Sequence, residues 1–174
     1  MAKALKSKKS VAYDSKEPVT HLNEPPSEYN IVNRAVGYLG GKSLGVVATA
    51  IQEDHDFILL IKKGVPRKSL DYLMQTTGLN ENELASIMHT SDRTLRRYKP
   101  SKLLNTEQSE RVVELARLYS RGEEVFENMD SFKEWMDSTV MAIGNKKPKE
   151  LLDTSLGIEF LMDELGRIEQ GVFA

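Results

Sequence analysis

The chain contains no cysteine in its 174 residues. This absence excludes disulfide bonds, thiolate zinc sites and a cysteine nucleophile, and it is typical of proteins from a reducing compartment. No apolar run approaches the roughly 18–20 residues that a membrane-spanning helix requires. The N-terminus is basic, but no apolar core follows it, so it does not resemble a secretory signal. We therefore expect a soluble cytoplasmic protein with no membrane partner.

What the sequence does contain is an uneven distribution of charge. Apolar residues make up 40% and charged residues 29% of the chain, which is typical of a globular protein. Residues 62–102 carry nine basic and four acidic side chains, a net +5, whereas residues 103–174 carry eight basic and fifteen acidic ones, a net −7. Two oppositely charged segments indicate two different partners, the first a polyanion. The alternative is that solvated helix faces produce the asymmetry incidentally.

The hydrophobic periodicity is helical, and no segment alternates with the period of a strand over a useful length. The predicted fold class is therefore all-α, a helix-turn-helix domain followed by a small helical domain. We divide the chain into four parts. These are a flexible N-terminal tail, N-terminal helices that provide a possible dimerisation surface, a helix-turn-helix region and a C-terminal domain, at residues 1–29, 30–61, 62–105 and 106–174.

Capping and breaking residues predict the helix boundaries in the first half of the chain. Gly40 and Gly41 break the first helix, and Ser43 can cap a second one across residues 44–51. The apolar run 57–61 is compatible with a strand or a helix by itself, and its neighbours favour a helix. Residues 62–66, Lys-Lys-Gly-Val-Pro, end it.

The same signals predict two longer helices in the second half. Thr106 can cap the first of them, which ends or bends at residues 121–122, Arg-Gly. The last helix is capped by Asp153 or by Thr154, and Gly171 stops it.

One stretch in the middle of the chain has the spacing of a helix-turn-helix. Asn80 and Glu83 can form a capping box at the start of its first helix, and Ser91 can cap its second. The steep crossing of the two helices requires a small residue, which Ala85 provides. The turn residue is commonly glycine, and here it is His89, a type that adopts the left-handed conformation more readily than most. The apolar positions that the spacing requires are filled by Leu84, Met88, Leu95 and Tyr98.

The second helix of such a motif presents its N-terminal face to the major groove of DNA. Arginine can bind guanine through two hydrogen bonds, serine and threonine can reach bases or phosphates, and a helix N-terminus favours phosphate. The predicted residues of this helix are Ser91, Arg93, Thr94, Arg96 and Arg97. Phosphate contacts, which position a protein without reading sequence, are predicted for Arg67, Lys68, Lys99 and Lys102. The alternative is an ordinary helical hairpin with a charged face.

Further stretches along the chain occur in the order found in one family of antitoxins. They are Lys62–Pro66, Leu79–Asn80, Glu83–Ala85, Arg93–Leu95, Glu107–Arg111, Leu115–Arg117, Glu123–Phe126, Trp135, Pro148–Thr154, Gly157 and Leu165–Ala174. With this set the chain resembles the Xre-type antitoxins of the RES–Xre, MbcA and ParS group over about residues 57–174. It departs from their pattern at residues 140–143, Val-Met-Ala-Ile, where the family has an Asn-Pro-Ala-Leu-type segment.

The resemblance implies a type II antitoxin that neutralises a RES-domain toxin, an enzyme that consumes NAD⁺. It also implies that the complex binds its own promoter and represses it. In that family the C-terminal helix and tail cover the toxin's active-site entrance. The toxin-binding residues predicted on this basis are Arg167, Glu169, Gln170, Gly171, Val172, Phe173 and Ala174. The expected partners are the cognate RES-domain toxin, operator DNA and further copies of the chain, in a homodimer and a higher-order toxin–antitoxin complex.

Physical reasoning supports the C-terminal part of this prediction independently. A rigid helix that delivers a short tail leaves little ordering entropy to be lost on binding, and Phe173 offers a large apolar anchor. The alternative is that Phe173 packs back onto its own domain.

No catalytic residue, cofactor or metal site is predicted. Residues 41–43, Gly-Lys-Ser, resemble the end of a phosphate-binding loop, but Val36 stands where that loop requires glycine. The adjacent acidic and histidine side chains of residues 53–56 cannot easily converge on one ion. No nucleophile–base constellation is recognisable, so we expect no enzymatic activity. Two other functions remain open, a helix-turn-helix repressor with a ligand-sensing C-terminal domain and a structural adaptor with no role on DNA.

Overall fold

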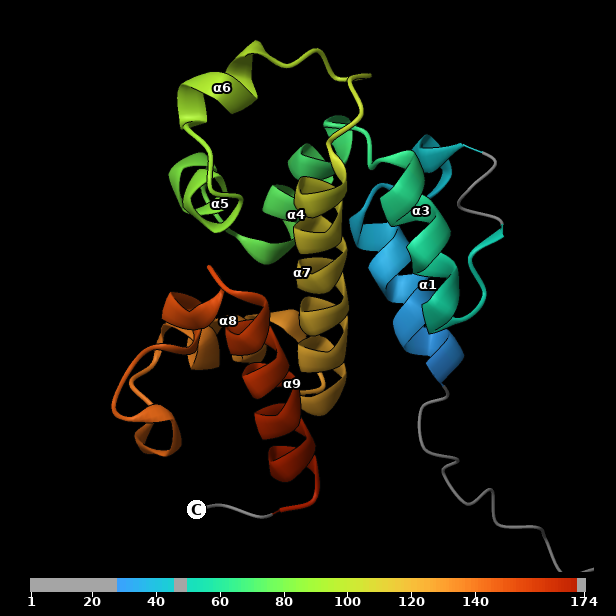
Figure 1. Cartoon of the computed structure of the whole chain (residues 1–174). Coiled ribbons are helices and arrows are strands. Elements are labelled where there is room, and N and C mark those ends of the chain that lie inside the picture. The colour runs from blue at the N-terminus through green and yellow to red at the C-terminus, as the bar shows by residue number, and fades with distance from the viewer. Residues whose placement is uncertain (1–27, 46–49, 172–174) are drawn as a thin grey trace, which may run out of the picture.

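The structure, a computed structural model, describes residues 28–45 and 50–171 (Figure 1). These residues form helices joined by turns, with two isolated β-bridges and no strand among them. The predicted all-α fold class is confirmed. Residues 1–27 of the predicted tail, and Val47 and Ala48 of the predicted second helix, lie outside the described residues. No helix in the described ranges is both long and apolar enough to cross a membrane.

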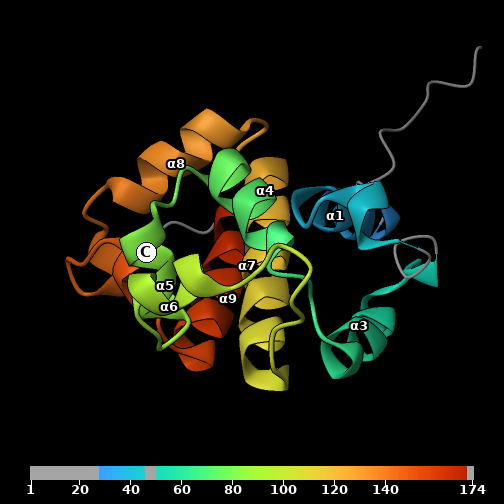
Figure 2. The same ribbon diagram turned by 90° about the horizontal axis from the view of Figure 1, so that it is seen from above.

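The longest helix, α7 (Thr106–Val125), runs through the middle of the molecule. Helices α1 (Glu28–Tyr38) and α3 (Phe57–Lys63) pack on one side of it, and α8 (Met129–Asp137) and α9 (Ser155–Glu169) pack on the other (Figures 1 and 2). Because α7 has neighbours on both sides, its apolar residues are covered almost all round. The fully buried ones are Val112, Leu115, Ala116 and Leu118. One hydrophobic core therefore extends from α1 to α9.

Along the chain, three short helices follow α3 and precede α7. They are α4 (Lys68–Thr77), α5 (Glu81–Ile87) and α6 (Asp92–Arg97), and α6 lies at one end of the molecule (Figure 1). The helix predicted for the run at 57–61 is confirmed as α3, which ends before Gly64 at a φ of 96°. Short 3-10 helices complete the fold: η1 (Gly41–Leu44), η2 (Asp54–Asp56), η3 (Met141–Ile143) and η4 (Pro148–Leu151).

The second helix that Ser43 was predicted to cap falls largely on residues 46–49, outside the described residues, so this cap stays a prediction. Gly40 and Gly41 end α1 as expected, with φ values of 101° and 48°. The chain then turns into η1, and Ser43 lies within that 3-10 helix. Its hydroxyl is 3.0 Å from the hydroxyl of Tyr72 on α4. The Ser43 hydroxyl therefore joins η1 to α4.

Helix α7 differs from its prediction at both ends. Asn105, and not Thr106, is the cap, because its side-chain oxygen accepts the backbone N–H of Gln108 at 2.8 Å. The helix also continues without interruption past Gly122 to Val125. Gly122 is buried against the ring of Phe132 from α8, so the glycine allows two helices to approach closely and does not end the first.

The last helix begins and ends where the sequence places it. Of the two candidate caps, Thr154 is the one used, since its hydroxyl accepts the backbone N–H of Gly157 at 3.0 Å. Gly171 follows the helix with a φ of 69°, as expected for a helix stop.

Candidate functional site

The helix-turn-helix forms with the local contacts that the sequence predicts. The side chain of Asn80 accepts the N–H of Glu83 at 3.0 Å, and the Glu83 carboxylate accepts the N–H of Asn80 at 2.8 Å. Ser91 caps α6 by accepting the N–H of Thr94 at 3.1 Å. Between the two helices His89 adopts a φ of 50°, in the left-handed region. The capping box, the second cap and the left-handed turn residue are all confirmed.

The two helices approach closely at the predicted small residue. Ala85 is buried, and its carbonyl accepts the N–H of Thr90 at 2.9 Å, in the turn that leads to α6. Leu84, Met88 and Leu95 are buried with it, and Tyr98 is half-buried. This packing fixes the orientation of α6 and leaves its polar face in solvent.

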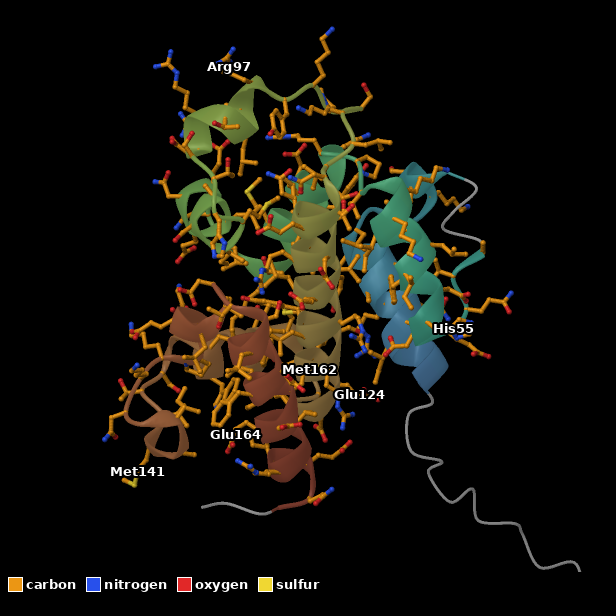
Figure 3. The ribbon with its side chains drawn as sticks, in the orientation of Figure 1. His55, Arg97, Glu124, Met141, Met162 and Glu164 are labelled. Carbon is orange, nitrogen blue, oxygen red and sulfur yellow. The ribbon has the colours of Figure 1, made fainter. Side chains whose placement is uncertain are left out.

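The arginines of α6 differ in how they are held. Arg93 and Arg97 are exposed, and neither makes an ion pair within the described residues; Arg97 points outward from the tip of the molecule (Figure 3). Arg96 instead pairs with Glu81 on α5 at 2.9 Å and with Asp92 at 3.0 Å. The hydrogen bond to Glu81 raises the pKa of Arg96. Arg93 and Arg97 are therefore the freer of the three to meet a ligand.

An open hollow of about 490 Å³ lies at the C-terminal end of α6. Four predicted residues, Thr94, Arg97, Lys99 and Lys102, line it together with Tyr98 and Ser101. The ammonium of Lys102 lies 3.8 Å from the centre of the Tyr98 ring, a cation–π contact that holds it over the hollow. Sequence reasoning assigned Tyr98 only to the core and did not single out Ser101. Basic and hydroxyl groups that converge in this way suit a phosphate.

The remaining two predicted phosphate contacts lie outside this hollow. The side chain of Arg67 is only 14% exposed and pairs with Asp71 at 2.5 Å. Its backbone N–H donates to the carbonyl of Lys102 at 2.8 Å, so Arg67 positions the segment that carries that lysine. Lys68 is exposed, with its ammonium 5.5 Å from the ring centre of Tyr72.

Two polar contacts connect the helix-turn-helix to the C-terminal half. The ammonium of Lys149 lies 2.9 Å from a carboxylate oxygen of Glu83 on α5 and 2.8 Å from one of Asp137 on α8. The ring nitrogen Nε2 of His89 lies 2.8 Å from the carbonyl oxygen of Asp153. Partial burial would raise the pKa of Glu83, but the hydrogen bonds from Lys149 and from the Asn80 backbone hold it below its usual value. Hydrogen bonds to Asp137 and Glu83 raise the pKa of Lys149.

Two of the predicted toxin-binding residues, at the C-terminal end of α9, form ion pairs within the chain. Arg167 pairs with Glu164 at 2.7 Å, and Glu169 pairs with Arg121 on α7 at 2.5 Å. Gln170 and Gly171 are exposed. The predicted residues Val172, Phe173 and Ala174 lie outside the described residues.

Comparison with known proteins assigns two domains within residues 56–171. Residues 56–117 match the antitoxin Xre-like helix-turn-helix domain, and residues 121–171 match the antitoxin Xre/MbcA/ParS C-terminal toxin-binding domain. The chain belongs to the Xre/MbcA/ParS antitoxin family. The antitoxin thus combines a helix-turn-helix domain with a toxin-binding domain, in the order in which the sequence predicted them.

Over the aligned residues, the following three relatives are each less than one third identical to the antitoxin. It is 29% identical over 129 residues to the Prs ADP-ribosylating antitoxin of Sphingobium sp. (strain YBL2), which covers 68% of this chain and 81% of that protein. It is 27% identical over 117 residues to the antitoxin Xre of Yersinia enterocolitica, covering 66% and 78% of the two chains. It is 23% identical over 115 residues to the antitoxin Xre of Photorhabdus laumondii, covering 65% and 78%. All three relatives carry the name antitoxin.

The antitoxin also exposes large apolar side chains, of which Ile58 and Leu59 lie in the segment 30–61 that the sequence predicts as a possible dimerisation surface. Within the described residues they are Ile58, Leu59, Leu103, Met141, Leu156 and Phe160. Met141 projects from the segment between α8 and η4 at the edge of the molecule (Figure 3). Leu156 and Phe160 fall outside the buried stripe of α9, which is the signal that could have found them. On α9 the two lie one helical turn apart, and adjacent exposed apolar side chains are typical of an interaction surface.

Proposed function

We propose that this antitoxin neutralises a RES-domain toxin by covering its active-site entrance, and that it represses its own operon by binding operator DNA. The observation that carries the proposal is the match of residues 121–171 to a toxin-binding domain next to a helix-turn-helix with an exposed basic helix. The two surfaces lie far apart, since α6 and the last turn of α9 are at opposite ends of the molecule (Figure 1). Toxin and DNA therefore need not compete for the same surface.

The relative from Sphingobium supports a toxin that consumes NAD⁺. Its name refers to ADP-ribosylation. That reaction transfers ADP-ribose from NAD⁺ to an acceptor and releases nicotinamide, so an antitoxin of this kind would face an NAD⁺-binding enzyme. We propose that Arg167, Glu169 and the residues that follow occupy its entrance. Phe173 serves as the apolar anchor, delivered by the rigid helix α9.

On DNA, we propose that Arg93 and Arg97 contact base edges in the major groove. Neither makes an ion pair with another described residue, which supports this role because a bidentate contact to guanine requires an unengaged guanidinium group. The hollow beside Arg97 would hold a backbone phosphate, with Lys99 and Lys102 as its cations.

We further propose that the antitoxin acts as a homodimer, because helix-turn-helix proteins commonly pair to match two half-sites. The outer face of α3 supports this proposal. It exposes Ile58 and Leu59 between the acidic η2 and the basic pair Lys62 and Lys63. A face with acid at one end and base at the other is complementary to itself in an antiparallel, two-fold arrangement.

Co-expression tests the proposal most directly. The chain is produced together with the protein encoded by the adjacent reading frame, and complex formation, cell growth and the NAD⁺ level are measured. We expect a stable complex, restored growth and restored NAD⁺. Filter binding to the upstream DNA should show specific retention. DNA binding without any toxin complex would favour a repressor that senses a ligand, and a complex without DNA binding would favour an adaptor.

A further inference from the structure

The 3-10 helix η1 and helix α4 bring two hydroxyl groups together beside the helix-turn-helix. The hydroxyl oxygens of Ser43 and Tyr72 lie 3.0 Å apart, and either group can donate to the other. A hydrogen bond between them uses one of their two O–H groups, and the other has no acceptor within the described residues. The hydrogen bond with Ser43 and the ammonium of Lys68 lower the pKa of Tyr72, which makes its O–H a stronger donor. The pair therefore has a donor to offer to a ligand.

Two cations accompany these hydroxyls. Lys42 directly precedes the serine and is exposed, and the exposed Lys68 holds its ammonium 5.5 Å from the ring centre of Tyr72. Neither lysine forms an ion pair with another residue in the part of the chain that the structure describes. The carboxylate next to the tyrosine in the sequence, that of Asp71, pairs with Arg67. The two ammonium groups are therefore available to an anion.

Backbone contacts fix this group of residues to the hollow beside α6. The ring of Tyr72 lies directly against Gly40, because a Cβ on that glycine would come within 2.5 Å of the ring. The backbone N–H of Lys68 donates to the carbonyl of Pro100 at 3.0 Å, in the loop that leads to Lys102. In Figure 1 the blue segment that ends in η1 and the helix α6 both reach the upper part of the molecule. The two sites therefore belong to the same end of the antitoxin.

We propose that Lys42, Ser43, Lys68 and Tyr72, which we call the η1 cradle, bind a phosphate of the DNA backbone outside the segment that α6 reads. The inference rests on the proposed operator binding. Residues 41–43, Gly-Lys-Ser, do not form a phosphate-binding loop, but their ammonium and hydroxyl are the groups that hold phosphate oxygens. Because the matched helix-turn-helix domain begins at residue 56, the contact of Lys42 and Ser43 is an addition to that domain.

The openness of the cradle favours DNA over a free anion as its ligand. Lys42, Ser43 and Lys68 are exposed, so a free phosphate would remain largely hydrated and would bind weakly there. A phosphate of a duplex that α6 already holds arrives at a high effective concentration, and each such contact releases counterions from the DNA. The net charge of +5 on residues 62–102 attracts the same polyanion.

The test uses the full-length antitoxin and the DNA upstream of its own reading frame, in filter binding at several salt concentrations. Lys42→Gln should weaken binding to all sequences by about 3- to 10-fold, and the slope of log affinity against log salt concentration should fall by about 0.9. Tyr72→Phe keeps the ring and loses the O–H, so the affinity should fall by a similar factor with the slope unchanged. Lys133→Gln on α8 removes the same charge as Lys42→Gln and should change neither quantity. Circular dichroism checks that each variant is folded.

Ethylation interference identifies the phosphate itself. On wild-type protein we expect a phosphate outside the contacts of α6 whose ethylation blocks binding, and Lys42→Gln/Tyr72→Phe should lose that sensitivity alone. Wild-type affinity in both single variants, with a wild-type chain that binds the operator, would overturn the cradle and leave the proposed function intact. A wild-type chain that does not retain the upstream DNA would overturn both. If Lys42→Gln weakens binding but the double variant keeps the wild-type interference pattern, the lysine acts only through general charge and the proposal is wrong.

Discussion

Gly122 of α7 faces the ring of Phe132 of α8 so closely that a Cβ at position 122 would lie 2.4 Å from three ring atoms. The ring has no room to move away. It is fully buried, and the rings of Tyr119, Phe126 and Trp135 surround it with centres 5.2, 5.7 and 5.8 Å away. The close approach of α7 and α8 in the antitoxin therefore depends on this glycine.

We predict that Gly122→Ala destabilises the antitoxin although alanine is the better helix former by about 1 kcal/mol. Overpacking a filled core costs about 1–3 kcal/mol. Because several rings confine Phe132, we expect a net loss of about 2 kcal/mol in the free energy of unfolding, measured in urea. Gly166→Ala on α9 is the matched control. No atom of the described residues lies within 4 Å of a Cβ at that position, so this substitution should stabilise the protein. A Gly122→Ala variant as stable as Gly166→Ala would contradict the argument.

A second prediction concerns Lys149, which joins α5 to α8. Lys149→Met removes the partner of both Glu83 and Asp137 and should lower the free energy of unfolding by about 1 kcal/mol at neutral pH, as expected for a partly exposed charge network. Lys133→Met is the control, because Lys133 pairs only weakly, at 3.9 Å, with the almost fully exposed Asp130.

The pH dependence of this effect follows from the lowered pKa of Glu83. A carboxyl group whose pKa is lower in the folded than in the unfolded state contributes stability above the unfolded pKa, and loses it as the pH falls through the folded pKa. We therefore expect the stability difference between wild type and Lys149→Met to be present at pH 7. It should shrink as the pH falls below 4.5, the usual value for this group. Thermal unfolding of both proteins between pH 7 and the acid range measures the difference. A gap that widens on acidification is the opposite of what the lowered pKa requires.

A third prediction separates the arginines of α6. Arg93→Ala and Arg97→Ala should each cost about 1–3 kcal/mol on the specific operator and relax its sequence preference. Arg96→Ala should cost less, because Arg96 is already engaged by Glu81 and Asp92. Lys102→Ala should weaken binding to all sequences alike. The slope of log affinity against log salt concentration should fall by about the amount that one phosphate contact contributes. Filter binding at several salt concentrations distinguishes these effects. A folded triple variant of Arg93, Arg96 and Arg97 with full operator affinity would show that α6 does not read DNA.

The fourth prediction concerns the tail. An antitoxin that ends at Gln170 should keep its fold and its DNA binding, because the buried stripe of α9 and the helix-turn-helix remain intact. It should lose much of its power to neutralise the toxin. Phe173→Ala should cause part of the same loss, up to the few kcal/mol typical of a buried aromatic anchor. Growth and NAD⁺ level of cells that produce the toxin with each variant are the measurements. If the truncated chain protects as well as the full one, the tail is not the inhibiting element.

The local geometry of the helix-turn-helix could be predicted from the sequence alone. The capping box of Asn80 and Glu83 joins residues three apart, and the left-handed turn at His89 depends on the backbone preference of one residue. The cap by Ser91 is equally local. Neighbouring residues form such contacts whatever the rest of the chain does. The family resemblance could likewise be found from the order of short motifs along the chain.

Which residues are free to act depends on contacts in the folded chain. Gly122 looks like a helix end in the sequence, and Phe132, ten positions later, makes it a helix-packing residue instead. The sequence predicts the same DNA-binding role for Arg93 and Arg96, yet Arg96 forms an ion pair with Glu81 from another helix. The exposure of Phe160 follows from which face of α9 packs on α7. These outcomes depend on contacts between segments that lie far apart in the sequence. Such contacts form only when the whole chain folds, because no local pattern encodes which helix will cover which face.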